Sequence, residues 1–192
     1  MVVGTLRNAQ LVINQQAIFE NVKNARQHTD EGTDLFVVLK ANGYGHGAIQ
    51  VARIAEKAGA TGFCVALLDE ALELRNAGFN EPILVLGITD PEFAAIARDH
   101  NISLTVSSTE WLKSAAITLK QVPSETLLNV HLALDTGMGR LGFQYADELK
   151  AAIQVLTDLN DVMNFEGIFT HFATADSQMT ITLIISTIIS IS

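Results

Sequence analysis

One lysine of this sequence stands where an amine could act as a nucleophile. Lys40 follows the apolar run Leu35–Leu39, whose length and β-branched content are typical of a strand buried on both faces. A lysine at the end of such a strand is partly desolvated, which favours the neutral, nucleophilic amine. Glycines follow at positions 43, 45 and 47, and glycine lets backbone approach a ligand closely. The alternative is a lysine that extends its ammonium group to solvent.

An arginine in a second glycine-rich segment could bind a carboxylate. Arg140 lies in the segment Asp135–Gly142, which follows the apolar run Leu127–Leu134. A guanidinium group can make two parallel hydrogen bonds to a carboxylate, so Arg140 is a candidate substrate contact. Alternatively, Arg140 pairs with Asp135 and only braces the loop.

A histidine ends the last apolar segment, and no metal centre is predicted. His171 lies in Phe165–Phe172, either as a ligand contact or as a structural hydrogen-bond partner. The other histidines are too scattered along the sequence to predict a metal site. The single cysteine, Cys64, excludes an internal disulfide and a cysteine-cluster metal site.

Strand-like and helix-like segments alternate along the chain, which predicts parallel strands joined by right-handed crossovers. An eight-stranded α/β barrel and an open doubly wound sheet both fit this alternation. Candidate side chains at several strand ends favour the barrel, whose sites gather at one face. From residue 35 onward about six βα units are predicted, so we expect a partial TIM barrel. The predicted strands are 9–13, 35–39, 62–66, 82–87, 102–106, 127–134 and 165–172, and the predicted helices are 14–28, 48–58, 69–77, 146–156 and two that begin near residues 90 and 108.

Three stretches resemble motifs of alanine racemases, which are pyridoxal-phosphate-dependent enzymes. Val38–Gly47 is similar to the family's lysine motif, usually written V-K-A-N-A-Y-G-H-G, with Gly43 in place of the usual alanine. Asp135–Gly142 matches a second signature without a break, and Gly167–Asp176 is a third match. The resemblance covers about residues 5–178 and implies the barrel fold.

The resemblance also implies roles for individual residues. Lys40 would bind pyridoxal phosphate covalently and exchange the Cα proton on one face of alanine, while a tyrosine of the partner subunit serves the other face. Tyr44 would help to hold the cofactor phosphate, and His171 would pack beside the pyridoxal ring. Arg140 would lie by the substrate carboxylate. Many family members brace that arginine with a carbamylated lysine where this chain has Ala133, so an anion or water would substitute, or Arg140 would be held less firmly.

Composition narrows the class of function. The 192 residues carry a net charge of −9 and have a pI near 4.9, which disfavours a nucleic-acid-binding protein because no basic patch is available to meet phosphates. The amino-terminal sequence lacks the pattern of a secretory signal, and the apolar end of the chain is too short to span a membrane. We therefore expect a cytoplasmic protein.

Two segments are expected: an incomplete pyridoxal-phosphate-binding barrel domain in residues 1–178 and an unrelated tail in residues 179–192. The tail lacks charge and is built almost entirely from Ile, Ser, Thr and Leu. A reading frame shifted by one base would permit the acidic, Tyr-Phe-containing continuation of the family. We therefore expect a frameshift near residues 177–179, which sequencing of the encoding DNA tests. The last barrel strands and the β-rich carboxyl-terminal domain of the family would then be missing.

Three functions compete. The first is an alanine racemase that interconverts L-alanine and D-alanine for peptidoglycan precursors, a homodimer at full length but truncated and inactive alone here. The second is a non-catalytic remnant, and the third is a single-barrel protein that binds pyridoxal phosphate. The intact Asp135–Gly142 signature favours the racemase lineage over the binding protein. The tyrosine that would serve the second face of alanine is absent from this sequence, which favours the remnant over an active enzyme.

Overall fold

The computed structural model describes residues 11–173. The chain forms two compact units, unit 1 (Met1–Phe63) and unit 2 (Cys64–Ser192). The predicted tail 179–192 lies outside the described residues, and so do residues 174–176 of the third motif and residues 9 and 10 of the first predicted strand.

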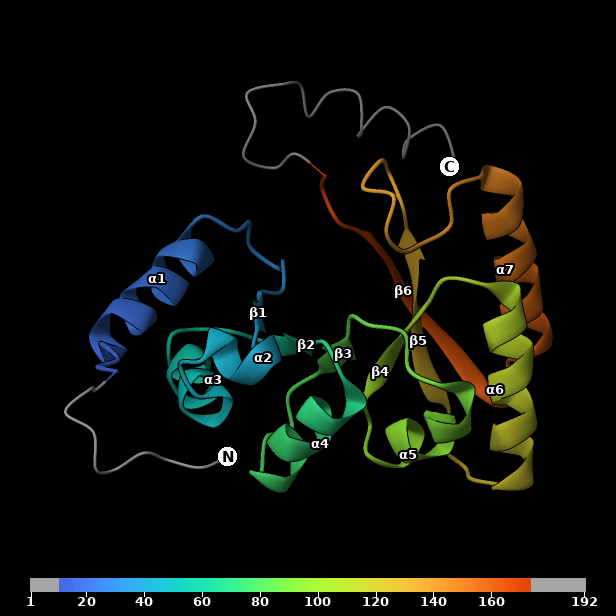
Figure 1. Ribbon diagram of the computed structural model, residues 1–192, viewed down its shortest axis with the longest axis horizontal. Coiled ribbons are helices and arrows are strands. Elements are labelled where there is room, and N and C mark those ends of the chain that lie inside the picture. Colours follow the sequence, from blue (N-terminus) through green and yellow to red (C-terminus); the bar gives the residue numbers. More distant parts are fainter. Residues whose placement is uncertain (1–10, 174–192) are drawn as a thin grey trace. The chain divides into compact units, whose positions relative to one another are not determined.

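Unit 1 begins with a capped helix, as predicted. The side chain of Asn14 accepts a hydrogen bond of 3.1 Å from the backbone N–H of Ala17, at the start of the first helix. Residues 11–13 form no strand, which corrects the prediction for 9–13: Leu11 and Val12 are 77% and 83% exposed, so no neighbouring strand covers them. The elements of unit 1 are α1 (Gln15–Gln27), β1 (Phe36–Val38), α2 (Lys40–Tyr44), α3 (Ala48–Lys57) and the start of β2 (Gly62–Val65) (Figure 1).

Strand β1 is an edge strand in the described residues. The chain just before β1 is held by Leu35, whose carbonyl accepts a hydrogen bond from the backbone N–H of Thr61 at 2.9 Å. Leu39, just after the strand, is fully buried, but Val38 is 36% exposed. The prediction of a strand buried on both faces is therefore wrong. The physical reason is that β1 ends the sheet, so in the described residues no strand on its far side helps to cover Val38.

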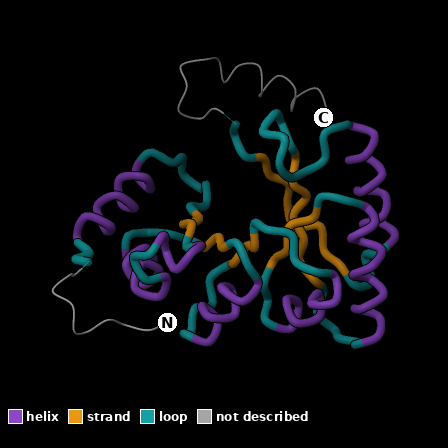
Figure 2. The backbone as a smooth tube through the Cα atoms, in the orientation of Figure 1, coloured by secondary structure: helices purple, strands orange, loops and turns teal. Residues whose placement is uncertain are grey.

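Unit 2 repeats a strand followed by a helix, which confirms the predicted alternation. Strand order follows sequence order, and the pairs β3–β4, β4–β5 and β5–β6 are parallel, as expected for part of an α/β barrel. None of the helices in residues 11–173 is both long and apolar enough to cross a membrane. The elements are the end of β2, α4 (Leu68–Asn76), β3 (Ile83–Val85), a 3₁₀ turn (Pro91–Phe93), α5 (Ala94–Asp99), β4 (Ser103–Val106), α6 (Thr109–Gln121), β5 (Leu128–Leu134), α7 (Ala146–Asp158) and β6 (Met163–Thr170) (Figure 2).

The two faces of β5 differ in polarity. Leu128, Val130 and Leu132 are fully buried, and α6 and α7 run along one side of the strands of unit 2 (Figure 1). Asn129 and His131 alternate with these leucines and the valine and are only half-buried. The hydrophobic core of unit 2 therefore lies between strands and helices, and the other face of the strands carries polar side chains.

Arg75 of α4 fixes the turns that lead into two strands of unit 2. Its guanidinium group donates hydrogen bonds of 2.6–2.9 Å to four backbone carbonyl oxygens. Two of the acceptors precede β3 and two precede β4, so one side chain ties both strand entrances to the helix. The acceptors belong to Phe79, Glu81, His100 and Asn101.

Candidate active site

Lys40 lies two residues beyond the end of β1, on the carboxyl-terminal side of the strand. Barrel enzymes place their catalytic side chains at this end. The lysine is half-buried, and its Nζ lies 5.9 Å from the centroid of the Tyr44 ring, which is a cation–π distance. Among residues 11–173, no carboxylate forms an ion pair with Lys40. Unit 1 thus brings together an amine and a phenol, while all the other lysines lie on helices, as predicted.

A left-handed turn connects the lysine to the tyrosine. Ala41, Asn42, Gly43 and Tyr44 all have φ between +53° and +61°, and Gly45 follows at +83°. For residues with a Cβ this conformation costs about 1–2 kcal/mol each. The turn nevertheless closes like a helix of the opposite hand, because the N–H of Gly43 donates to the carbonyl of residue 39 at 2.7 Å.

Helix α3 stabilises this strained turn. The Oδ1 atom of Asn42 accepts a hydrogen bond of 2.9 Å from the backbone N–H of Ala48, the first residue of α3. The carbonyl of Asn42 also accepts from Gly47 at 2.9 Å. Asparagine tolerates positive φ better than most residues, so Asn42 can both adopt the turn and cap the helix. Gly43 adopts the same φ without the steric cost of a Cβ, which gives a physical reason for glycine here.

In unit 2, the carboxylate of Asp135 organises the loop that carries Arg140. It accepts hydrogen bonds from the backbone N–H groups of Gly139 at 2.9 Å and Gly137 at 3.1 Å, and from the side chain of Gln144 at 3.2 Å. The N–H groups of Gly139 and then Gly137 hold the pKa of Asp135 below its usual value, with a smaller contribution from Gln144. This role of Asp135 was not predicted from the sequence.

The base of the same loop closes onto the end of β5. The N–H of Phe143 donates to the carbonyl of Ala133 at 2.8 Å, and the N–H of Asp135 donates to the carbonyl of Phe143 at 3.0 Å. A Cβ on Gly142 would lie 2.5 Å from the nitrogen of Asp135, so only glycine fits this approach. The loop is therefore a closed structure with Arg140 near its tip.

The guanidinium group of Arg140 is exposed and forms no ion pair or hydrogen bond with any residue in 11–173. The alternative in which Arg140 pairs with Asp135 is therefore wrong, because backbone N–H groups occupy that carboxylate. Ala133 is 2% exposed and its methyl group cannot brace the arginine. Arg140 is available for an external carboxylate.

The loop of Arg140 is tied to the end of the strand that precedes His171. Thr136 Oγ1 lies 2.7 Å from Thr170 Oγ1, and Thr170 Oγ1 donates to the carbonyl of Leu134 at 2.9 Å. The strand predicted at 165–172 begins two residues earlier and ends at Thr170, so the exposed His171 lies just beyond it. Unit 2 thus anchors the segments of Arg140 and His171 to one another.

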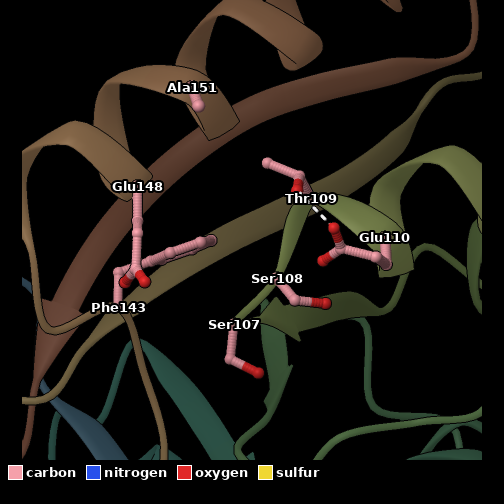
Figure 3. Close-up of a pocket in the computed structure, with 7 residues that line it drawn as sticks. All are labelled: Ser107, Ser108, Thr109, Glu110, Phe143, Glu148 and Ala151. Carbon is pink, nitrogen blue, oxygen red and sulfur yellow. Dashed lines mark hydrogen bonds between the residues drawn. The ribbon is translucent and has the colours of Figure 1, made fainter.

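Two cavities of unit 2 lie beside this loop. One, of about 240 Å³, is lined in part by Ser107, Asp135 and Arg140. The other, of about 280 Å³, shares Ser107 but carries the carboxylates of Glu110 and Glu148 and no cation (Figure 3). A carboxylate therefore suits the smaller cavity, which contains the guanidinium group, better than the larger one. Figure 3 shows the lining of the larger cavity: Ser107, Ser108, Thr109, Glu110, Phe143, Glu148 and Ala151.

A polar cluster on the half-buried face of β4–β6 was absent from the sequence prediction. Glu166 Oε2 accepts a hydrogen bond of 2.5 Å from Ser103 Oγ and lies 2.9 Å from Nε2 of His131. A β-bulge in the pairing of β5 with β6 gives β6 the extra residue that presents this carboxylate. The one signal in the sequence was a glutamate inside an apolar strand. In the described part of the chain, no group of three or more side chains is arranged to hold a metal ion.

The sequence matches relatives of one family. A family model described as "Alanine racemase, N-terminal domain" matches residues 13–184. The chain is 57% identical over 177 residues to the alanine racemase of Levilactobacillus brevis and 56% identical over 176 residues to that of Lactiplantibacillus plantarum. Each match covers 92% of this chain and 47% of the relative, so the chain spans about half the length of these relatives.

Solved structures give the same result. The alanine racemase of E. faecalis matches with a TM-score of 0.91 and 46% identity, covering 100% of this chain and 53% of that one. A histidine racemase from Leuconostoc mesenteroides matches with a TM-score of 0.82 and 40% identity, covering 92% and 46%. The chain therefore belongs to the alanine racemase family, and it corresponds to the family's N-terminal domain.

Proposed function

We propose that this chain supplies the lysine-bearing half of a pyridoxal-phosphate-dependent racemase that interconverts L-alanine and D-alanine. The observation that carries the proposal is Lys40, a half-buried amine beyond the carboxyl-terminal end of strand β1, close to the Tyr44 ring and without a carboxylate partner in residues 11–173. Such an amine is suited to bind a carbonyl cofactor. In the wider proposal the enzyme is a cytoplasmic homodimer that supplies D-alanine for peptidoglycan.

The residues present fit pyridoxal phosphate. The aldehyde of this cofactor requires an amine, which Lys40 provides, and its phosphate requires hydrogen-bond donors, of which the Tyr44 hydroxyl is one. The exposed His171 in unit 2 is the residue we assign to the pyridoxal ring. When bound, pyridoxal phosphate supplies the electron sink that stabilises negative charge at the substrate Cα.

Two side chains carry the chemistry of the protein itself. The Nζ of Lys40 accepts the Cα proton on one face of alanine and can return it to that face. Arg140 binds the alanine carboxylate through two parallel hydrogen bonds and so orients the Cα–H bond. A tyrosine of the partner subunit serves the opposite face in the family that the motifs resemble. Inversion requires both faces.

Alanine is the substrate we favour over a larger amino acid. The chain is 57% identical in sequence to the alanine racemase of Levilactobacillus brevis, whereas it is 40% identical to the histidine racemase. The open cavity beside Arg140 measures about 240 Å³, which offers room for a small amino acid.

Borohydride labelling tests the cofactor lysine. The protein is mixed with pyridoxal phosphate, reduced and digested, and the labelled peptide is identified by mass spectrometry. We expect the label on Lys40, and Lys40→Arg should remove it. Lys57→Arg, on helix α3, is the matched control and should leave labelling unchanged. Label spread evenly over the other lysines would contradict the assignment.

We further propose that these 192 residues alone do not racemise alanine at a useful rate. Phe165 and Ile168 of β6 are 43% and 46% exposed, although a closed barrel covers both sides of every strand. The test follows interconversion of the alanine enantiomers with cofactor present, using the full-length racemase of Levilactobacillus brevis as the control. Turnover close to that of the control would refute the proposal.

A further inference from the structure

We propose that the hydroxyl groups of Thr136 and Thr170 position Arg140 for a substrate carboxylate. This inference rests on the function proposed above. The guanidinium group of Arg140 has no partner in residues 11–173, so whatever orders it must act on the backbone of its loop. Both threonines are half-buried, and Thr136 lies four residues before Arg140.

The direction of the hydrogen bonds follows from the number of protons. A threonine hydroxyl has one proton, and that of Thr170 is donated to the carbonyl of Leu134 at 2.9 Å. The proton in the 2.7 Å contact between the two hydroxyls must therefore come from Thr136. The result is a chain of donors from the loop to strand β6 and back to strand β5. Consecutive hydrogen bonds of this kind strengthen one another.

These hydrogen bonds attach to β6 a loop that is otherwise held by the Asp135 carboxylate inside it and by the backbone hydrogen bonds of Phe143 at its base. Asp135 holds the N–H groups of Gly137 and Gly139 from inside the loop. The threonine pair instead fixes the loop to β6, a separate element. Without it, the loop would no longer be attached to β6 and would open more often, which exposes the Gly137 and Gly139 amides that Asp135 holds. Thr136 and Thr170 are therefore positioning residues, which contact no substrate themselves.

The test uses the 192-residue chain labelled with ¹⁵N, and it compares Thr136→Val and Thr170→Val with Thr170→Ser. Thr157→Val is the matched control, because Thr157 also donates to a backbone carbonyl, at 2.9 Å, but on helix α7. One readout is hydrogen exchange of the Gly137 and Gly139 amides. The other is the affinity for acetate, measured from the side-chain Nε–H signal of Arg140.

Loss of one hydrogen bond should speed exchange of the loop amides about three- to ten-fold and weaken acetate binding by a similar factor in both valine variants. The serine and control variants should resemble the original protein. Unchanged exchange in both valine variants, or a serine variant as impaired as the valine variant, would overturn the inference. So would equally faster exchange at Val130 in β5, because the threonines would then stabilise the whole unit. If acetate fails to shift the Arg140 signal in the original protein, the proposed function fails, while the exchange rates still decide whether the pair orders the loop.

Discussion

Two glycines in the Arg140 loop allow backbone strain to be separated from steric overlap. Gly137 and Gly142 both have a φ of +125°. A Cβ on Gly137 would have no atom within 4 Å, whereas a Cβ on Gly142 would lie 2.5 Å from a backbone nitrogen and 2.6 Å from a backbone carbon. Replacing each glycine by alanine therefore imposes a similar conformational cost, but only Gly142→Ala forces the loop away from β5.

The expected magnitudes follow from this geometry. A residue with a Cβ in a sparsely populated conformation costs about 1–3 kcal/mol, which is the expected loss for Gly137→Ala. In Gly142→Ala the least costly relief is to separate the loop base from β5. That breaks the two hydrogen bonds that join Phe143 to Ala133 and Asp135. At about 1 kcal/mol for each bond, Gly142→Ala should be less stable than Gly137→Ala by about 2 kcal/mol.

Urea unfolding measures this difference. The fluorescence of Trp111, the single tryptophan, reports on unit 2, where its ring is buried and its Nε1 donates to the carbonyl of Thr89. The unfolding slope should be the same in both variants, so the difference should appear in the midpoint. Equal midpoints for Gly137→Ala and Gly142→Ala would show that the close approach of residue 142 to β5 does not contribute, and the reasoning would be refuted.

Three further outcomes are expected. Arg75→Met should lower the free energy of unfolding, measured by urea unfolding, by about 2–4 kcal/mol, because four carbonyl groups lose a charged donor. Full recovery of stability in Arg75→Lys would contradict the dependence on the branched guanidinium group. Burial raises the pKa of the Cys64 thiol from 9.0 to about 11, which corresponds to about 3 kcal/mol of stability. This contribution is complete below pH 9 and is lost as the pH rises toward 11, so Cys64→Ser should remove that part of the pH dependence of stability. Gly43→Ala should lower the free energy of unfolding by about 1 kcal/mol, and Gly45→Ala should lower it by nearly the same amount. The reason is that a Cβ on Gly43 would only touch its neighbours, at 3.4 Å, and a Cβ on Gly45 would have no atom within 4 Å. A much larger loss for Gly43→Ala in urea unfolding would show that the turn cannot adjust.

The sequence predicted the elements whose signals are local. Lys40 stands between a short apolar run and closely spaced glycines, and both features lie within a dozen residues. Helix α1 was predictable together with its cap, because Asn14 directly precedes it. Apolar runs likewise predicted the strands of unit 2 to within a few residues. The motif around Arg140 could be predicted in the same way, since it is continuous in the sequence.

Other features depend on contacts between distant residues and could not be predicted. The left-handed conformation of Ala41 and Tyr44 is unfavourable for both residue types and persists because Asn42 caps α3. The cluster around Glu166 depends on its pairing with β5, and no local pattern determines that register. The role of Asp135 in holding the Arg140 loop could not be predicted for a different reason. Its charge suggested an ion pair, whereas backbone N–H groups satisfy it.

The β-bulge in β6 has a consequence for how this strand tolerates changes of length. Phe165 pairs with Val130 and Gly167 with His131, so Glu166 is the residue that has no counterpart on β5. Strand β6 therefore uses eight residues to span the seven of β5. A one-residue deletion elsewhere in a strand turns every following side chain to the opposite face. Removal of Glu166 would instead leave Phe165 and Gly167 in the register of a regular ladder, so at this position the strand can lose a residue without its later side chains changing face.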